Sequence, residues 1–403
     1  MATASPWQRP LDAVRADVAV AGGGIVGTAT AFWLRRLAPD LRVVLLEAER
    51  LAHGASGRNA GFLLLGVHGD YAAAVDAYGR DAAHRAWRFT EENFDLITSE
   101  FDAGAIGLER TGSVIAAGSA EEAARLRRAR GLLAEDGVGA EWLDRGAVAD
   151  RVGARGYAGA LVVPKGGAVD PARLVRRLAA QSGADVREGW AVARIEPGAA
   201  GVRLEIAGGG MLEAERAALC VNAYLPRLLP DLGHAVRPVR AQMLATAPVA
   251  PVLPAPVYSH DGYFYLRQRP DGRVLLGGAR HLHEPDEVGY EDATTDALQA
   301  SLGAYLERHL PAAAGAPVER RWSGTMGFSP DGLPVLGDVP GVPGAHLAAG
   351  FTGHGMAYGV RFGLLFARRL LDRPDEAADL FTIDRFSHAE TGRAVDSRPP
   401  PRV

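Results

Sequence analysis

Short apolar runs alternate with a helical pattern at the start of the chain. The run VAVA at residues 18–21 predicts a buried strand that ends in a cluster of glycines. A helical pattern follows to about Leu37, and RVVLLE at residues 42–47 predicts a second buried strand. The sequence therefore predicts a βαβ unit near the N-terminus.

Different patterns follow downstream. Apolar residues recur mostly at helical spacing between residues 70 and 101, with charges between them, which predicts long surface helices. Asp170 followed by Pro171 is typical of a helix start, and short strand candidates continue from there to Val221. Residues 263–267 and 273–278 flank the turn PDG at residues 270–272, which predicts a hairpin in an antiparallel sheet.

The C-terminal part again alternates a strand pattern with a helix pattern. Residues 346–351 predict a strand, and residues 355–371 predict an apolar helix. The sequence SRPPPRV at residues 397–403 is typical of a disordered tail.

Composition narrows the class of protein. The chain has 403 residues, of which 48% are apolar and 23% are charged. This is enough to bury a large core, either in two separate domains or in one pair of domains that are interwoven. A net charge of −4 with scattered arginines makes nucleic acid an unexpected partner. Each apolar stretch is broken before the about 20 residues that span a bilayer, so no membrane span is expected.

The N-terminal segment and the single cysteine bear on the cellular location of the protein. Residues 1–17 carry charges and lack a continuous apolar core, so we expect no secretory signal and a protein that starts there. Cys220 lies in an apolar run and is the only cysteine, which excludes an internal disulfide and favours a buried structural thiol. We expect a cytoplasmic protein.

The first chemical motif is a glycine pattern between the first strand and helix. Gly22, Gly24 and Gly27 form G-x-G-x-x-G, and Glu47 ends the next strand. These glycines allow backbone amides to approach a pyrophosphate at the helix N-terminus, and Glu47 can accept hydrogen bonds from an adenosine ribose. The alternative is a glycine-rich turn without a ligand, and the motif alone does not separate FAD from NAD.

Two further glycine-rich segments extend this pattern. GASGRNAG at residues 54–61 has small residues that allow backbone to lie against a planar ligand, although alone it would be a flexible surface loop. GFTGHGM at residues 350–356 leads into a second helix, whose positive N-terminus can stabilise the charge of a reduced isoalloxazine ring. The alternative there is a plain strand-to-helix turn, and we assign no catalytic role to His354.

In combination these segments resemble the D-amino-acid oxidase superfamily of flavoproteins, which includes glycine oxidase, sarcosine oxidase and the γ-glutamylputrescine oxidase group. The resemblance covers most of the chain. It adds GAVDP at 167–171, VNAYLP at 221–226, LGGAR at 276–280 and RWSGTMGFSPDG at 321–332.

The resemblance implies FAD in an extended conformation, with the first glycine motif at the pyrophosphate, Glu47 at the ribose, Val192 at the adenine and residues 353–356 by the flavin pyrimidine. The expected cofactor-binding residues are Gly22, Gly24, Ile25, Val26, Gly27, Glu47, Ala48, Ala55, Ser56, Gly57, Arg58, Asn59, Gly61, Val192, Asn222, Ala223, Gly324, Asp331, Gly350, Gly353, His354, Gly355 and Met356.

Some relatives attach their flavin to a cysteine or a histidine. The segments matching those sites, residues 321–328 and 55–61, contain neither residue here, and Arg58 stands where histidyl-linked relatives carry histidine. We therefore expect noncovalent FAD.

The expected fold class is α/β, a Rossmann-type βαβ domain that binds FAD, interleaved with an antiparallel-sheet substrate domain. We expect residues 1–85, 150–228 and 325–395 in the FAD-binding domain, 86–149 and 229–324 in the substrate domain, and 396–403 in a disordered tail.

The resemblance also implies an Arg and a Tyr over the flavin that bind a substrate carboxylate. The predicted hairpin offers Tyr265, Arg267 and Arg280, and strand alternation puts Tyr263 on the same face as Tyr265 and Arg267. Which face meets the flavin is open, and each arginine has a structural ion pair as its alternative. His260 and His281 are weaker candidates.

The expected reaction is oxidation of a small amine or amino acid. A hydride passes from the carbon bearing nitrogen to flavin N5, and the resulting imine is hydrolysed. Dioxygen or another acceptor would reoxidise the flavin. The alternatives are an FAD-dependent 2-hydroxy-acid dehydrogenase, an NAD-dependent dehydrogenase and a nonenzymatic flavin-binding protein.

Overall fold

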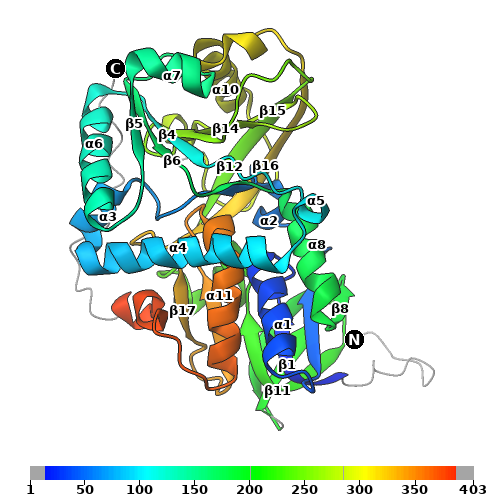
Figure 1. Cartoon of the computed structure of the whole chain (residues 1–403). Helices are drawn as coiled ribbons and strands as arrows, with labels where there is room; N and C mark the ends of the chain where they lie inside the picture. The colour runs from blue at the N-terminus through cyan, green and yellow to red at the C-terminus, as the bar shows by residue number, and fades with distance from the viewer. Residues whose placement is uncertain (1–13, 200, 285, 387–403) are drawn as a thin grey trace.

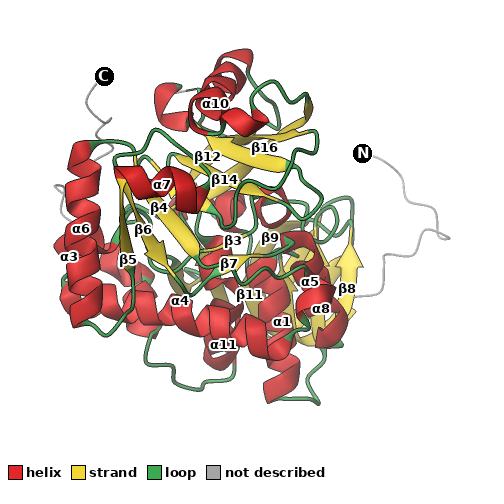
Figure 2. Ribbon diagram, turned by 45° about the horizontal axis from the view of Figure 1, so that its top comes forward, coloured by secondary structure: helices red, strands yellow, loops and turns green. Residues whose placement is uncertain are grey.

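A computed structural model describes residues 14–199, 201–284 and 286–386 (Figure 1). Within these residues the strands form two large sheets and one small pair, β3 (Phe62–Leu63) with β7 (Gly167–Ala168), and helices pack on both large sheets (Figure 2). The α/β class is therefore confirmed. The predicted tail at 396–403 lies outside the described residues.

The first sheet has the strand order β17-β18-β11-β1-β2-β8, and β10 and β9 continue from β11. The five strands from β18 to β8 are parallel, as expected of a Rossmann-type unit, and β17 is antiparallel. The strands are β1 Val14–Ala21, β2 Val43–Glu47, β8 Asp185–Glu188, β9 Val192–Gly198, β10 Gly201–Ile206, β11 Met211–Leu219, β17 Val335–Asp338 and β18 Ala345–Ala349.

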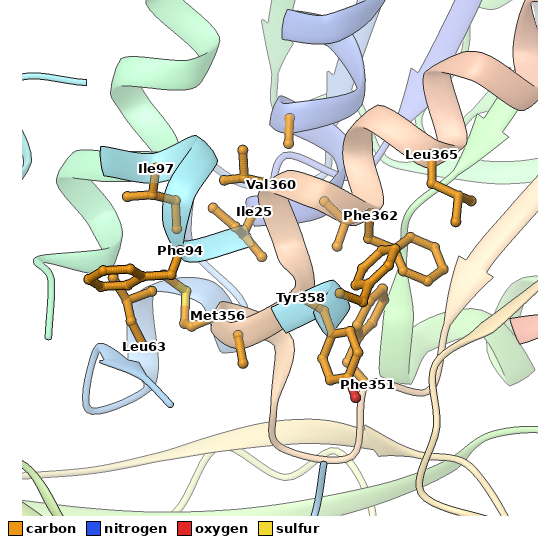
Figure 3. Packing of buried hydrophobic residues seen from close by; sticks show 14 of the residues in the cluster. Ile25, Leu63, Phe94, Ile97, Phe351, Met356, Tyr358, Val360, Phe362 and Leu365 are labelled. Atoms are coloured by element: carbon orange, nitrogen blue, oxygen red, sulfur yellow. The ribbon is translucent and has the colours of Figure 1, made fainter. Parts of the chain in front are cut away.

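Both faces of β1 are buried, which explains its uninterrupted apolar sequence. Val18 and Val20 belong to the core on the helical face, whereas Ala19 and Ala21 belong to the core on the other face. Helices α1 (Ile25–Leu37), α8 (Pro171–Ser182) and α11 (Gly355–Leu370) cover the first face, and α4 (Arg80–Glu100) crosses α11 (Figure 1). Figure 3 shows side chains of this core, including Ile25 and Val360.

The second sheet has the order β16-β12-β15-β14-β13-β4-β6-β5. All its pairs are antiparallel except β13 with β4. The strands are β4 Ser113–Ala117, β5 Glu141–Asp144, β6 Gly159–Val163, β12 Arg237–Thr246, β13 Val257–Ser259, β14 Phe264–Gln268, β15 Val274–Gly278 and β16 Val318–Phe328. The remaining helices are α2 Ala55–Arg58, α3 Tyr71–Tyr78, α5 Ala103–Ile106, α6 Ala120–Glu135, α7 Arg145–Val152, α9 Leu225–Leu228 and α10 Asp296–His309.

The predicted elements are present, with shifts at their ends. β1 begins before the apolar run, because residues 14–16 pair with 212–214 although only one face is apolar there. The expected helical stretch at 70–101 divides at Gly79, whose φ is +81°. Asp170 caps α8 by accepting from the Arg173 N–H at 3.0 Å, as its sequence predicted.

The two sheets do not follow the predicted domain ranges at every point. β6 lies within the range 150–228 but pairs with β4 and β5 in the second sheet. Most of α4 lies within the range 86–149 but packs on α11 beside the first sheet. The domain boundaries therefore stay a prediction. No helix in the described ranges is both long and apolar enough to cross a membrane.

Candidate active site

A cavity lies where the glycine-rich end of the first sheet faces the second sheet. Its walls come from the starts of α1 and α11, from α2, and from β12, β14 and β16. About 1270 Å³ of it is free of protein atoms, counting the part open to solvent. The segments predicted to carry chemistry, although more than 300 residues apart in sequence, therefore share one cavity.

Two helix N-termini reach this cavity. Gly24 precedes α1 and His354 precedes α11; neither residue caps its helix with a side chain, and neither helix has an acidic residue in its first turn. The Ile25 N–H donates to Ser56 Oγ at 2.9 Å. Ser56 therefore satisfies one N–H of α1, and the remaining N–H groups at both helix starts carry partial positive charge that favours an anion.

The acidic residue of the first motif holds the glycine turn. Glu47 Oε2 accepts from the Gly23 N–H at 2.7 Å, and its Oε1 accepts from the Glu49 N–H at 3.0 Å. A methyl group on Gly27 would lie 1.9 Å from the Gly22 carbonyl oxygen. The turn is therefore built for close backbone approach, as the motif predicted.

Asn222 connects the end of β11 to the C-terminal glycine turn. It has a φ of +44°, and its Oδ1 accepts from the Gly350 N–H at 3.0 Å. Asn222 lines the cavity, as do Gly353 and Met356. One amide thus ties the end of β11 to the third glycine-rich segment.

The opposite wall carries Arg280 among aromatic rings. The guanidinium carbon lies 4.7 Å from the centre of the Tyr263 ring and 5.2 Å from that of Phe328. Tyr258 and Tyr265 line the same wall, and burial raises the pKa of both hydroxyls. These side chains are neutral at ordinary pH, so the wall is apolar with one fixed positive charge.

Two histidines also face the cavity. The rings of His68 and His354 lie 5.7 Å apart, edge to face. Burial lowers the pKa of His68 to about 3, with smaller contributions from His354 and Arg280, and burial also lowers the pKa of His354. Both imidazoles are therefore neutral at pH 7.

The family pattern described as FAD dependent oxidoreductase matches residues 17–369, which is most of the chain. The chain belongs to this family. Its resemblance to D-amino-acid oxidase relatives, read from the sequence, is therefore confirmed.

Individual proteins similar to this chain are consistent with this family membership. The chain is 29% identical to glycine oxidase of Geobacillus kaustophilus over 385 residues, covering 93% of this chain and 97% of the relative. It is 26% identical to the γ-glutamylputrescine oxidoreductase of Escherichia coli, covering 91% of this chain and 86% of that protein. The crystal structure of the Geobacillus glycine oxidase superposes with a TM-score of 0.78 at 24% identity, covering 91% and 98% of the two chains, which confirms the fold.

The cavity of this FAD-dependent oxidoreductase has the features that FAD requires. Two uncapped helix N-termini suit a pyrophosphate and the polar edge of a flavin, and the small residues of segment 54–61 form a wall against which a flat ring can lie. Of the predicted cofactor-binding residues, those lining the cavity are Gly24, Ile25, Val26, Ala55, Ser56, Arg58, Asn59, Asn222, Gly324, Gly353, His354, Gly355 and Met356.

The other predicted cofactor residues lie outside the cavity lining: Gly22, Gly27, Glu47, Ala48, Gly57, Gly61, Val192, Ala223, Asp331 and Gly350. Two of these make contacts within the protein. Asp331 forms an ion pair with Arg385 at 2.6 Å, and the Ala223 carbonyl accepts from Tyr290 Oη at 3.0 Å. Their direct contact with FAD stays a prediction.

Of the three predicted substrate residues, Tyr265 and Arg280 line the cavity and Arg267 does not. Nη1 of Arg267 donates to the carbonyls of Ala60 and Val169 at 3.1 and 3.0 Å, and its Nη2 donates to Glu109 Oε1 at 3.0 Å. The hairpin face with Tyr265 and Arg267 does point toward segment 54–61 and the adjoining Phe62. However, the contacts of Arg267 fit a structural role better than the predicted substrate role.

Several lining residues were not among the predicted site residues: Phe62, His68, Met243, Tyr258, and, although inside the quoted segment 321–332, Met326 and Phe328. Phe62 directly follows segment 54–61, so its position was a usable signal. His68 and Tyr258 carry no local motif, and only the tertiary structure brings them to the cavity. His260 and His281, the weaker candidates, do not line it.

Proposed function

We propose that the enzyme oxidises a small amine or amino acid that carries a carboxylate, with FAD held noncovalently. The observation that carries this proposal is the state of Arg280. Arg280 is 6% exposed, and among the described residues its guanidinium has no acidic partner within 4 Å and no hydrogen-bond acceptor.

Within the part of the chain that the structure describes, three other arginines are similarly buried, and each has an acidic partner. Arg240 pairs with Glu287, Arg267 with Glu109 and Arg361 with Asp375, all at 2.9 or 3.0 Å. A buried guanidinium without an anion is costly, by several kcal/mol. Arg280 is the exception, and it faces the cavity, so a substrate carboxylate is the natural partner.

FAD, when bound, supplies a two-electron acceptor for a hydride. The chain's own groups orient the substrate and exclude water. Arg280 would hold the carboxylate in a bidentate geometry, and the rings of Tyr263 and Phe328 pack against its guanidinium. The hydroxyls of Tyr258 and Tyr265 stay protonated, so each can donate a hydrogen bond to substrate.

The titratable groups of the cavity favour an amine over a 2-hydroxy acid. An alcohol must lose its hydroxyl proton as the hydride leaves, which requires a base of suitable pKa. His68, with a pKa near 3, is a poor base for this purpose, burial also lowers the pKa of His354, and both tyrosines have raised pKa values. A neutral amine needs no such base during hydride transfer. The relatives named glycine oxidase and γ-glutamylputrescine oxidoreductase support the same choice.

Noncovalent attachment is supported by the groups next to the cavity. Arg58 is held by Asp292 at 2.7 Å and by the Ser323 carbonyl at 2.9 Å. Cys220 also lines the cavity, but burial raises its thiol pKa to about 12, so the reactive thiolate is scarce. Precipitation with trichloroacetic acid should leave all the FAD in the supernatant; yellow colour in the pellet would contradict this.

The function is tested by anaerobic visible spectra of the purified holoenzyme. Amines, D- and L-amino acids and 2-hydroxy acids are added one at a time. Bleaching of the oxidised flavin bands by an amino acid supports the proposal, and bleaching only by hydroxy acids overturns it in favour of the alternative. Readmitting air and assaying hydrogen peroxide then shows whether dioxygen is the acceptor. The cytoplasmic location stays a prediction.

A further inference from the structure

Arg125 of α6 connects two loops that line the cavity, although it does not line the cavity itself. Its Nε donates to Asp70 Oδ2 at 2.5 Å, and its Nη2 forms an ion pair with Asp261. Asp70 ends the segment 64–70 and its side chain is 3% exposed. Asp261 lies in the turn 259–262. One guanidinium therefore joins two segments nearly 200 residues apart in sequence.

Each of these segments contributes to one wall of the cavity. Leu64 and His68 come from the first segment, and Tyr258 and Gly262 come from the second or its border. The rings of His68 and Tyr258 both contact the ring of His354, with centroids 5.7 and 5.9 Å away. A shift of either loop would therefore change the shape of the cavity next to Arg280.

The turn at 259–262 has an unfavourable backbone. His260 and Asp261 both have a φ of +53°, which costs of order 1–3 kcal/mol for a residue with a side chain. Such a turn persists only if its surroundings hold it. Glu122 does so, because its Oε1 accepts from the Asp261 N–H at 2.9 Å while its Oε2 accepts from the Gly118 N–H at 2.7 Å.

We propose that Arg125 and Glu122 are positioning residues that hold segments 64–70 and 259–262 together as the substrate-facing wall of the cavity. This inference rests on the proposed function for its effect on turnover, but the coupling of the two segments is testable without it. Loss of the guanidinium would leave the carboxylates of Asp70 and Asp261 facing each other, and their repulsion would separate the loops.

The test compares FAD-loaded Arg125→Gln with Arg128→Gln. Arg128 lies on the same helix and forms a similar pair with Asp76 at 2.6 Å, but Asp76 belongs to neither loop. Hydrogen–deuterium exchange is followed in peptides covering 64–70 and 257–264, with β1 and β2 as internal references. We expect Arg125→Gln to raise exchange roughly 10-fold in both segments and to leave the references unchanged. Arg128→Gln should alter neither segment.

The kinetic arm uses the best amine substrate from the spectral screen. Arg125→Gln should raise KM about 10-fold with kcat changed less than about 3-fold, because orientation rather than chemistry is disturbed. Arg125→Lys keeps the positive charge and should recover part of the loss. If Arg125→Gln does not fold, Asp261→Asn removes one of the two ionic contacts and should raise exchange in both segments.

Unchanged exchange in the two segments, or a change in only one, would overturn the coupling. Coupled exchange with an unchanged KM would overturn the role in substrate positioning. If the wild-type enzyme oxidised none of the amines, the proposed function would fail while the exchange result still decided whether Arg125 joins the loops.

Discussion

The hydroxyl of Ser56 accepts a hydrogen bond of 2.9 Å from the N–H of Ile25, the first residue of α1. This bond joins the segment 54–61 to the first glycine motif, 31 residues earlier in the chain. The two motifs therefore form one surface, and changes at their junction should act on cofactor binding.

We predict that Gly24→Ala weakens FAD binding. A methyl group at Gly24 would lie 2.9 Å from Ser56 Oγ, so Ser56 must move and its bond to Ile25 is lost. The expected result is a dissociation constant raised about 10-fold or more, from one hydrogen bond and a poorer fit. Fluorescence titration of the apoprotein with FAD measures it. Gly54→Ala is the matched control, since its methyl group would meet no atom within 4 Å; equal affinities in the two variants would contradict the prediction.

Arg280→Met should abolish recognition of the substrate carboxylate. A charge-assisted bidentate pair contributes about 3 kcal/mol, so kcat/KM for an amino acid should fall roughly 100-fold. The corresponding amine without a carboxylate should be oxidised nearly as before or better. Arg273→Met, which removes an exposed arginine paired with Glu319, serves as control. A parallel loss on both substrates would show that Arg280 does not bind the carboxylate.

Arg267→Met should reduce stability and leave substrate affinity in the folded fraction unchanged. The substitution leaves the carbonyls of Ala60 and Val169 and the carboxylate of Glu109 without their donor. Removing one partner of a buried pair typically costs about 3–5 kcal/mol. Urea unfolding of the holoprotein measures the loss, and an altered KM at unchanged stability would instead restore Arg267 as a substrate residue.

Glu122 should make stability depend on pH. Burial raises its pKa from 4.5 to about 7, with Asp261 adding to the rise, while the N–H groups of Asp261 and Gly118 and the charge of Arg125 oppose it. The folded protein thus binds a proton more tightly than the unfolded chain, so this contribution is full below about pH 4.5 and is lost as pH rises toward 7. At about 1.4 kcal/mol per pKa unit it is on the order of 3 kcal/mol.

In Glu122→Gln the group no longer titrates, so unfolding free energies measured at intervals between pH 5 and 8 should fall less steeply than in the wild type. A wild-type curve without this fall, or an identical slope in the variant, would contradict the assignment. Glu121→Gln is the matched control, since Glu121 is the exposed neighbour on the same helix turn.

Local patterns were sufficient for the turns and helix starts whose structure depends on backbone conformation. The turn after β1, the cap at Asp170 and the start of α11 depend on glycines, a short acceptor and a proline within a few residues, and these act at short range. The sequence by itself therefore predicted the βαβ unit, the second helix N-terminus and the family.

Side-chain roles on the second sheet required the tertiary structure. Arg267 and Arg280 are both basic residues of one predicted hairpin region, and no local feature distinguishes them. They differ because Ala60, Glu109 and Val169, all distant in sequence, surround Arg267 with acceptors, whereas aromatic rings surround Arg280 and leave its charge to the cavity. The connection of Asp70 to Asp261 through Arg125 depends in the same way on long-range packing, because ionic contacts are fixed by where loops meet and not by sequence spacing.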